Sequence, residues 1–175
     1  IKTIRTENGT EFLQDVCDSF FKQFGISHQR SVAGTPQQNG RVERKNRHLV
    51  ETTRALKIHA NLPDSFGDPD IAATYIINRL PSSVLEWKSP FESLHGFKPD
   101  LSHLKTIGCL CYALSLKPRH DKFATKGRRC ILLGYPTGQK AYRLYDLDNH
   151  TVFVSRDVHF EEEIFPFRQH DFPKQ

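Results

Sequence analysis

The sequence predicts an α/β segment followed by a small, antiparallel all-β domain. In the first part of the chain, apolar residues recur with the helical period of 3.6, and short strand-like runs lie between these helices. From Lys105 onward, short β-type runs separated by turn residues dominate. The change in character at Lys98-Pro99-Asp100 places the boundary near residue 99, which gives domains over 1–98 and 99–165 and a tail over 166–175.

Composition sets the limits of this prediction. The 175 residues suit one domain or two small ones, and an apolar content of 37% is enough for a modest core. The net charge of +5 and the pI of about 9.1 permit a polyanionic partner without requiring one. No run approaches the roughly 18 apolar residues of a membrane span, and no secretory signal is recognisable, so we expect neither a membrane partner nor secretion. The lack of Met and the opening Ile-Lys-Thr-Ile-Arg run indicate an internal piece of a longer reading frame.

The N-terminal part reads as strand, helix, strand. Residues 1–6 form the end of a strand, Asn8-Gly9 marks a turn, and Thr10 can cap a helix that ends at Gly25. That helix carries a wide apolar stripe, made of Phe12, Leu13, Val16, Cys17, Phe20, Phe21 and Phe24. A short strand over 26–32 and a polar loop over 33–40 follow.

Three helices are expected next. The longest runs from about Asn39 to Ala60, and its inner face consists of Val42, Leu49, Thr53 and Leu56. A second has Asp68 as N-cap and Pro69 in its first turn, and it continues to about Arg79. The run Ser89-Pro90-Phe91-Glu92 has the residues of a capping box, so a short helix should extend to Gly96.

Four strands are expected in the second domain, over 106–114, 129–135, 141–146 and 151–160. Pro136-Thr137-Gly138 and Asp148-Asn149 have the composition of hairpin turns between them. Strands this short at such spacing favour a small antiparallel barrel or a meander.

The chemically suggestive stretch is the loop of residues 34–40 and the helix that it opens. Asn39, Glu43, Asn46 and Arg47 fall at i, i+4, i+7 and i+8, so they share one helix face. A carboxylate flanked by amides and a cation suits a metal-dependent phosphodiester site. The alternative is a solvated helix face that carries a mixed charge run.

Glu7 is the second candidate. It lies at a strand end just before a turn, where open α/β sheets place ligand-handling groups. Thirty-five residues separate it from Glu43, and two such carboxylates can converge on one divalent ion. The alternative is an ordinary, solvated turn acid.

Two weaker signals lie in the second domain. A basic loop could hold phosphates or could simply be solvated; it contains Lys117, Arg119, Lys122, Lys126, Arg128 and Arg129. The four cysteines are interpreted as reduced thiols that serve as small apolar residues, because paired Cys-x-x-Cys spacing is missing.

The run Glu7-Asn8-Gly9-Thr10-Glu11-Phe12, together with Gly34 to Arg47 (GTPQQNGRVERKNR), strongly resembles the integrase of copia-type LTR retrotransposon Pol polyproteins. Further segments resemble the same family, including its downstream Src-homology-3-like barrel; they are residues 77–83, 98–105, 108–112, 129–135 and 154–158. The resemblance therefore covers most of the chain and implies a truncated RNase H-like core followed by an SH3-like barrel.

The resemblance also assigns roles to residues. That core uses an Asp, Asp-35-Glu triad that holds Mg²⁺ or Mn²⁺. Glu43 matches its last acid and Glu7 stands in the place of its second Asp, so both become catalytic and metal-ligating candidates. The first Asp would lie upstream of Ile1. The residues expected to contact DNA are Gln37, Asn39, Arg44, Asn46 and Arg47.

Glu in place of Asp at position 7 is a departure with consequences. The added methylene displaces the carboxylate by roughly an ångström, and an error of that size can cost on the order of 10²-fold in rate. Since the first Asp of the triad is absent from this chain and Glu7 stands in place of the second, we expect an integrase fragment that is catalytically inactive and retains affinity for nucleic acid. Mg²⁺ or Mn²⁺ is the ion of the intact family. The resemblance implies transposon ends and target DNA as partners, a homo-oligomer, and a nuclear or cytoplasmic-particle location. The alternative is a non-enzymatic module that binds nucleic acid or protein.

Overall fold

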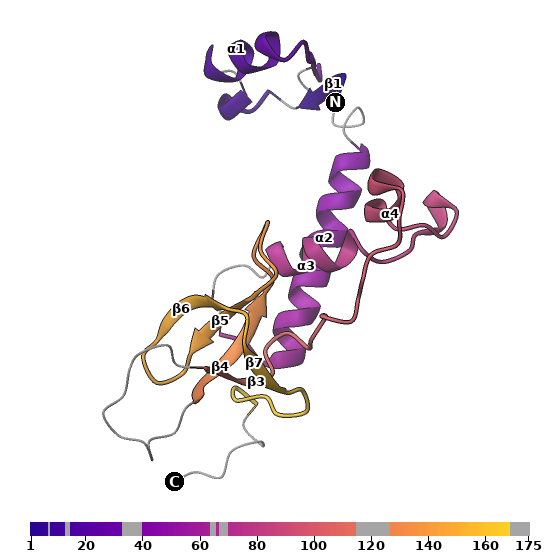
Figure 1. Ribbon diagram of the computed structural model, residues 1–175. Coiled ribbons are helices and arrows are strands. Elements are labelled where there is room, and N and C mark those ends of the chain that lie inside the picture. Colours follow the sequence, from indigo (N-terminus) through magenta and orange to yellow (C-terminus); the bar gives the residue numbers. More distant parts are fainter. Residues whose placement is uncertain are drawn as a thin grey trace. The chain divides into compact units, whose positions relative to one another are not determined.

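The structure, a computed structural model, describes residues 1–6, 8–12, 15–32, 40–63, 66, 70–114 and 127–168. The chain forms two compact units, residues 1–48 and residues 49–175. Figure 1 traces the elements of each unit along the sequence. Among the described residues, none of the helices combines the length and the apolar character that crossing a membrane requires.

The first unit contains a parallel strand pair joined through a helix. Strand β1 (Thr3–Thr6) pairs with β2 (Ser27–Arg30), with Thr3 opposite Ser27. The connection holds a 3₁₀ turn, η1 (Thr10–Phe12), and helix α1 (Asp15–Gln23). The strand, helix, strand order was predicted, but the predicted single helix begins at Thr10 as a separate 3₁₀ turn. Gly25 has a φ of +62°, in the left-handed region in which a glycine commonly ends a helix.

The core of this first unit is small. Phe21 packs on the His28 ring at 4.8 Å between centroids, and His28 Nε2 lies 2.8 Å from the hydroxyl of Thr6. Phe20 and Phe24, on the same predicted apolar stripe, are 52% and 61% exposed. The stripe is therefore only partly covered.

Helix α2 (Gly40–Ala60) follows the predicted bounds closely. Its inner face is buried at Thr53 and Ala60 and half-buried at Leu49 and Leu56. Val42 was expected on this face but is 59% exposed, because burial begins only in the later turns of the helix.

Two shorter helices and a 3₁₀ turn come next: α3 (Asp70–Ile77), η4 (Ser83–Leu85) and α4 (Pro90–His95). The predicted start of α3, at Asp68 and Pro69, lies outside the described residues. The predicted cap of α4 is confirmed, since Ser89 Oγ accepts a hydrogen bond from the Glu92 amide at 3.0 Å. Gly96, with a φ of +78°, ends this helix as expected.

The second unit contains a five-stranded antiparallel sheet, with the order β6-β5-β4-β3-β7. Its strands are β3 (Leu110–Leu114), β4 (Gly127–Gly134), β5 (Tyr142–Asp146), β6 (Thr151–Ser155) and β7 (Val158–Glu161). The first four strands form a meander, and β7 returns to pair with β3.

The single strand predicted over 151–160 is wrong, because Arg156 and Asp157 divide it into β6 and β7. These two strands are the opposite edges of the sheet, yet only two residues join them. The sheet must therefore curl until its edges approach each other, which is the geometry of a small barrel. The antiparallel sheet is consistent with the SH3-like barrel that the resemblance implies.

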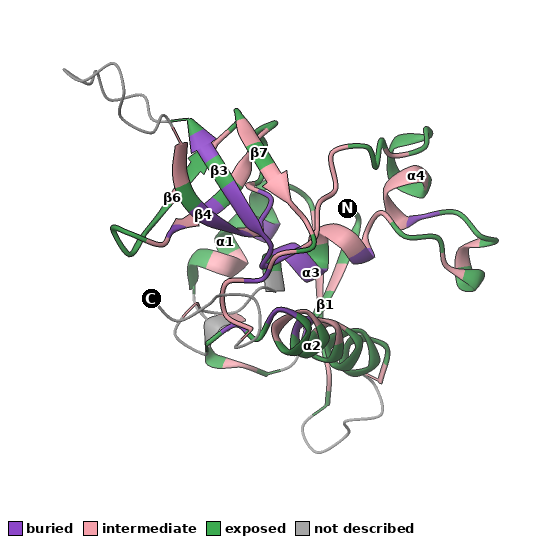
Figure 2. Cartoon of the chain, turned by 90° about the horizontal axis from the view of Figure 1, so that it is seen from below, coloured by how far each residue is buried: buried purple, intermediate pink, exposed green. Residues whose placement is uncertain are grey.

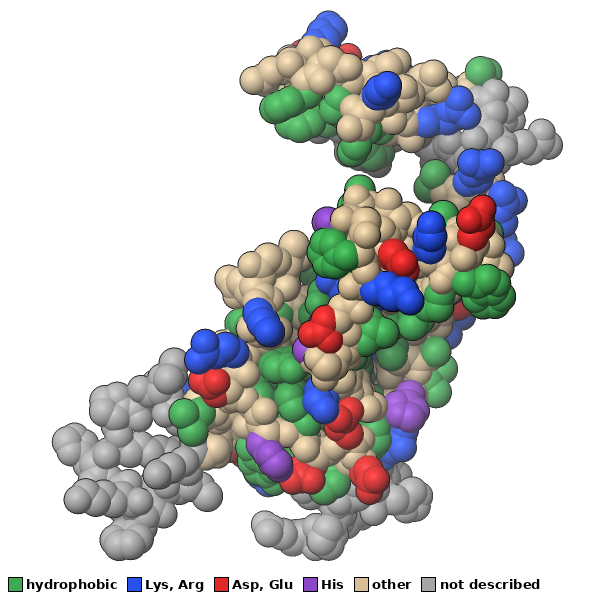
Figure 3. All heavy atoms as spheres, turned by 45° about the vertical axis from the view of Figure 1, so that its right-hand side comes forward, with side chains coloured by type: hydrophobic (Ala, Val, Ile, Leu, Met, Phe, Trp, Pro, Cys, Tyr) green, Lys and Arg blue, Asp and Glu red, His purple; other side chains and the backbone are tan. Residues whose placement is uncertain are grey.

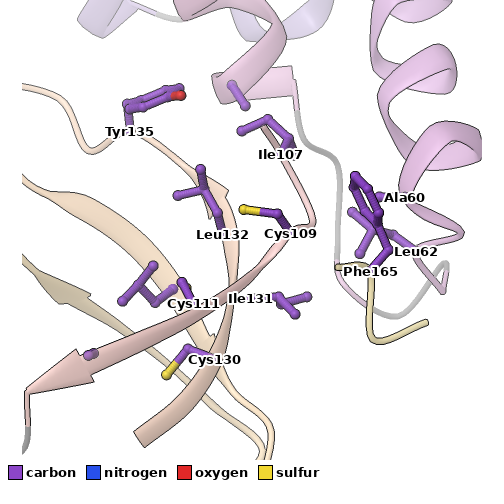
Figure 4. Close-up of a cluster of buried hydrophobic side chains, with 13 residues drawn as sticks. Ala60, Leu62, Ile107, Cys109, Cys111, Cys130, Ile131, Leu132, Tyr135 and Phe165 are labelled. Carbon is purple, nitrogen blue, oxygen red and sulfur yellow. The ribbon is translucent and has the colours of Figure 1, made fainter. Parts of the chain in front are cut away.

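The main core lies between this sheet and the helices of the second unit. Ala60, Leu62 and Ala72 from the helical part join the sheet residues Ile131, Leu132 and Leu144 in one buried cluster. Figure 2 shows burial concentrated on β3 and β4, whereas α2 is mostly exposed along its length. Figure 4 shows Phe165 beside Ala60 and Leu62, near the end of α2. The core thus spans both sides of the domain boundary expected near residue 99, and that boundary stays a prediction.

The cysteines of the second unit are packing residues. Cys109, Cys111 and Cys130 are fully buried, and their sulfurs are thiols rather than disulfides, as the sequence predicted. Burial raises the pKa of Cys109 to about 12 and that of Cys130 to about 11. Thiols with such values stay protonated near neutral pH, which suits a small apolar role.

Candidate nucleic-acid interface

Four of the predicted site residues lie on the first turns of α2. Glu43, Arg44, Asn46 and Arg47 are all exposed there. Glu43, Asn46 and Arg47 are spaced i, i+3 and i+4, so the helix places them on one face, and Arg44 is next to it. The other three predicted residues, Glu7, Gln37 and Asn39, lie outside the described residues.

The beginning of α2 is strongly basic. Arg41, Arg44, Lys45 and Arg47 surround one acid, Glu43, and each of these side chains is exposed. Figure 3 shows Lys and Arg side chains gathered where this helix begins. Glu43 occupies the first turn, where the positive end of the helix dipole favours a carboxylate. This surface can attract phosphate groups while it keeps one carboxylate among the cations.

The flanks of Glu7 are held at the carboxyl end of the strand pair. Ser31 donates its amide to the Thr6 carbonyl at 3.1 Å, which extends the ladder beyond β1 and β2. Asn8 donates its side-chain amide to the Ser31 carbonyl at 2.9 Å. The residues on either side of Glu7 are thus hydrogen-bonded to the residue that follows β2. This is the end of the strand pair where the sequence predicted a ligand-handling group.

The metal assignment stays a prediction. Within the described part of the chain, no three His, Cys, Asp or Glu side chains gather closely enough to hold a metal ion. Glu7 lies outside that part of the chain, so its convergence with Glu43 on one ion stays a prediction.

A second surface feature belongs to residues 49–175 and was not singled out from the sequence. A groove of about 740 Å³ has aromatic and cationic walls, which include Tyr75, Arg79, Phe97, Lys140, Tyr142 and Arg156. The i, i+4 spacing of Tyr75 and Arg79 was a visible signal, but the rest of the groove comes from α4, the segment after it and turns further along the chain.

Known proteins resemble this chain over nearly its whole length. The family model of the retroviral polymerase SH3-like domain matches residues 109–173. The retrovirus-related Pol polyprotein from transposon RE1 of Arabidopsis thaliana is 40% identical over 168 residues, which is 95% of this chain and 11% of that protein. The corresponding protein from transposon TNT 1-94 of Nicotiana tabacum is 38% identical over 163 residues, which is 93% of this chain and 12% of that protein. The chain belongs to the retrotransposon Pol polyproteins.

This Pol segment carries the SH3-like domain of its family within the second unit, so the family resemblance read from the sequence is confirmed. It spans about a ninth of the length of the relatives that it matches. A chain of the simian T-cell lymphotropic virus intasome, solved in complex with PP2A regulatory subunit B56 gamma, aligns with 91% of this chain and 57% of its own length. The identity is 16% and the TM-score is 0.46, which is too low to assign a fold.

Proposed function

We propose that this Pol segment belongs to the integrase region and holds DNA through the first turns of α2. The observation that carries the proposal is the exposed cluster of Arg41, Arg44, Lys45 and Arg47 around Glu43. Clustered cations on one helix supply the phosphate contacts that dominate affinity for duplex DNA. The strand, helix, strand unit before α2 supports an RNase H-like origin for this part of the chain.

The carboxylates of Glu43 and Glu7 suit a hard divalent cation. Glu43, and Glu7 with it, would hold Mg²⁺ or Mn²⁺ through oxygen ligands, the donor type that these ions prefer. When bound, such an ion stabilises the charge that develops on a phosphodiester under attack. We infer that residues 1–175 bind DNA without strand transfer, because Glu7 replaces an Asp of the family triad.

The test is a titration of duplex DNA with the full chain at several salt concentrations, followed by fluorescence anisotropy. Arg44→Gln and Arg47→Gln should each lower affinity and reduce the slope of log K against log salt by about 0.9, the value for one lost phosphate contact. Lys88→Gln and Arg143→Gln are controls, since both residues are exposed cations that do not belong to α2. Equal effects of all four changes would show that only the overall charge attracts DNA.

A second arm repeats the titration with Mn²⁺. If Glu43 ligates the ion, Mn²⁺ should raise both the DNA affinity and the melting temperature of the chain, and Glu43→Gln should abolish both effects. Glu51→Gln, at an exposed acid further along the same helix, should leave them intact. If Mn²⁺ changes neither the DNA affinity nor the melting temperature of the parent chain, Glu43 is not a metal ligand. The DNA interface would then be tested by the salt titration alone.

A further inference from the structure

The groove between the helical part and the sheet of the second unit has a size suited to a small ligand. Its volume of about 740 Å³ lies within the range of roughly 300–1,000 Å³ that is common for ligand pockets. The walls come from α3, α4, the segment after α4, the turn between β4 and β5, and Arg156 between β6 and β7. Residues 75–103, residues 136–142 and Arg156 therefore converge on one concave surface.

The inner wall is rigid before any ligand arrives. The Arg79 guanidinium lies 3.4 Å from the centre of the Tyr75 ring and donates a hydrogen bond to the Tyr75 carbonyl at 3.1 Å. Tyr135 stacks on the same ring, with 4.6 Å between centroids, so both faces of Tyr75 are covered. The Tyr75 hydroxyl lies 2.8 Å from His103 Nε2. A wall held in this way loses little entropy on binding.

One aromatic ring of the groove is open to a ligand. Phe97 is 61% exposed and meets Phe91 edge to face, at 5.5 Å and 83°. By contrast, Tyr142 is packed against Phe160 at 4.7 Å and donates its hydroxyl to the His103 carbonyl at 3.2 Å. A large exposed ring beside a concave surface provides a stacking platform.

The charge of the groove selects an anion. Among the described residues that line it, Arg79, Lys140 and Arg156 are cations and Asp100 is the one acid. The Asp100 carboxylate already accepts a hydrogen bond from the Ser102 amide at 2.9 Å. Arg156 contacts Asp157 at 3.3 Å, but both side chains are well exposed, and such pairs contribute little. A phosphate can therefore compete for the two exposed cations, Lys140 and Arg156.

We propose that this groove binds single-stranded nucleic acid, with a base stacked on Phe97 and backbone phosphates at Lys140 and Arg156. A duplex hides the faces of its bases within the stack, so only an unpaired nucleotide can offer a flat surface to the Phe97 ring. The proposal goes beyond the DNA interface at α2, because it concerns different residues and an unpaired ligand. A peptide rich in proline or acidic residues is the competing occupant, since aromatic grooves also take such segments.

The experiment compares two labelled probes on the full chain, a twelve-nucleotide oligothymidylate and a duplex of equal length. Phe97→Ala should weaken oligothymidylate binding by roughly fivefold to a hundredfold, the usual effect of losing one base-stacking ring, and should change duplex binding by less than about twofold. Trp87→Ala is the matched control, because Trp87 is 75% exposed and does not line the groove. Lys140→Gln and Arg156→Gln should each reduce the salt slope for the single strand by about 0.7.

The results separate the two proposals. Equal losses in Phe97→Ala and Trp87→Ala would overturn the groove proposal. Binding of a proline-rich or acidic peptide, with no measurable binding of oligothymidylate, would overturn it as well. Duplex binding that depends on Arg44 and Arg47, with no single-strand binding, would preserve the α2 interface and reject the groove. Melting curves of Phe97→Ala that match the parent chain confirm that the change acts on binding, since the ring is largely exposed.

Discussion

Gly108 occupies a position that requires glycine for two reasons. Its φ is +81°, in the left-handed region that side chains disfavour. A Cβ at this position would also overlap the Cβ of Ala60, at the end of α2. Gly108 therefore sets how closely the chain entering β3 approaches the helix.

Gly108→Ala should lower the free energy of unfolding by about 3 kcal/mol, because backbone strain of about 1–2 kcal/mol adds to overpacking. Gly138→Ala is the control. Gly138 has a similar φ of +72°, but a Cβ there meets nothing within 4 Å, so the loss should be about 1 kcal/mol. Thermal or urea unfolding followed by circular dichroism gives both values.

A double mutant isolates the steric part. Adding Ala60→Gly to Gly108→Ala removes one partner of the overlap, so the double mutant should be more stable than the sum of the single effects allows. Strict additivity would show that the backbone conformation alone demands glycine. The sequence could not reveal this requirement, because Ala60 lies 48 residues from Gly108 and only tertiary packing brings the two together.

At the level of elements, the hairpin of β5 and β6 is organised by a buried carboxylate. One oxygen of Asp146 accepts the amides of Asp148 and Asn149, both at 2.9 Å, and the other accepts the Asn149 side chain at 2.8 Å. Burial by itself raises the pKa of the Asp146 carboxyl. The hydrogen bonds from Asn149 and Asp148 outweigh burial and hold the pKa below its usual value.

Because the folded state lowers the pKa of Asp146, the ionised carboxylate stabilises the folded protein. The stabilisation is fully present above the unfolded-state pKa of about 3.9, and it is lost as the pH falls through the lower folded-state pKa. Asp146→Ala should cost about 2–3 kcal/mol at neutral pH, because the buried donors lose their acceptor. When the pH falls below about 4, the melting temperature of this variant should drop less than that of the parent chain. Asp157→Ala, at an exposed acid, should change neither the stability at neutral pH nor the drop in melting temperature in acid. A full acid-dependent loss in Asp146→Ala would assign this effect to other carboxylates.

The elements show which features a sequence pattern can predict. The long helix, the cap at Ser89 and the turn at Asp148-Asn149 depend on neighbouring residues, and their patterns were sufficient. The division at Arg156-Asp157 depends on β7 reaching β3, more than forty residues earlier in the chain, and an unbroken β-type run hides it. The basic face of α2 was predictable from spacing, whereas the groove around Phe97 required the fold.

On the scale of the whole molecule, the two units differ greatly in buried apolar content. Among the described residues of 1–48, Phe21 is the one apolar side chain that is buried, whereas the second unit holds the entire main cluster. Within the described residues, β1 and β2 pair only with each other, and two-stranded sheets are marginal in water. Unequal burial of this kind predicts unequal local stability.

Native-state hydrogen exchange followed by mass spectrometry should resolve this difference. The amides of β4, paired on both sides by β3 and β5, should be the slowest to exchange and should follow global unfolding. The amides of Ser27 and Ser31, bonded to Lys2 and Thr6 across β1 and β2, should exchange at least a hundredfold faster, because opening that pair releases little buried surface. Gly108→Ala should therefore accelerate exchange in β4 far more than in β2. Equal protection of the two strand sets would mean that the first unit draws its stability from contacts beyond its own small core, such as a partner chain paired along an edge of β1 or β2.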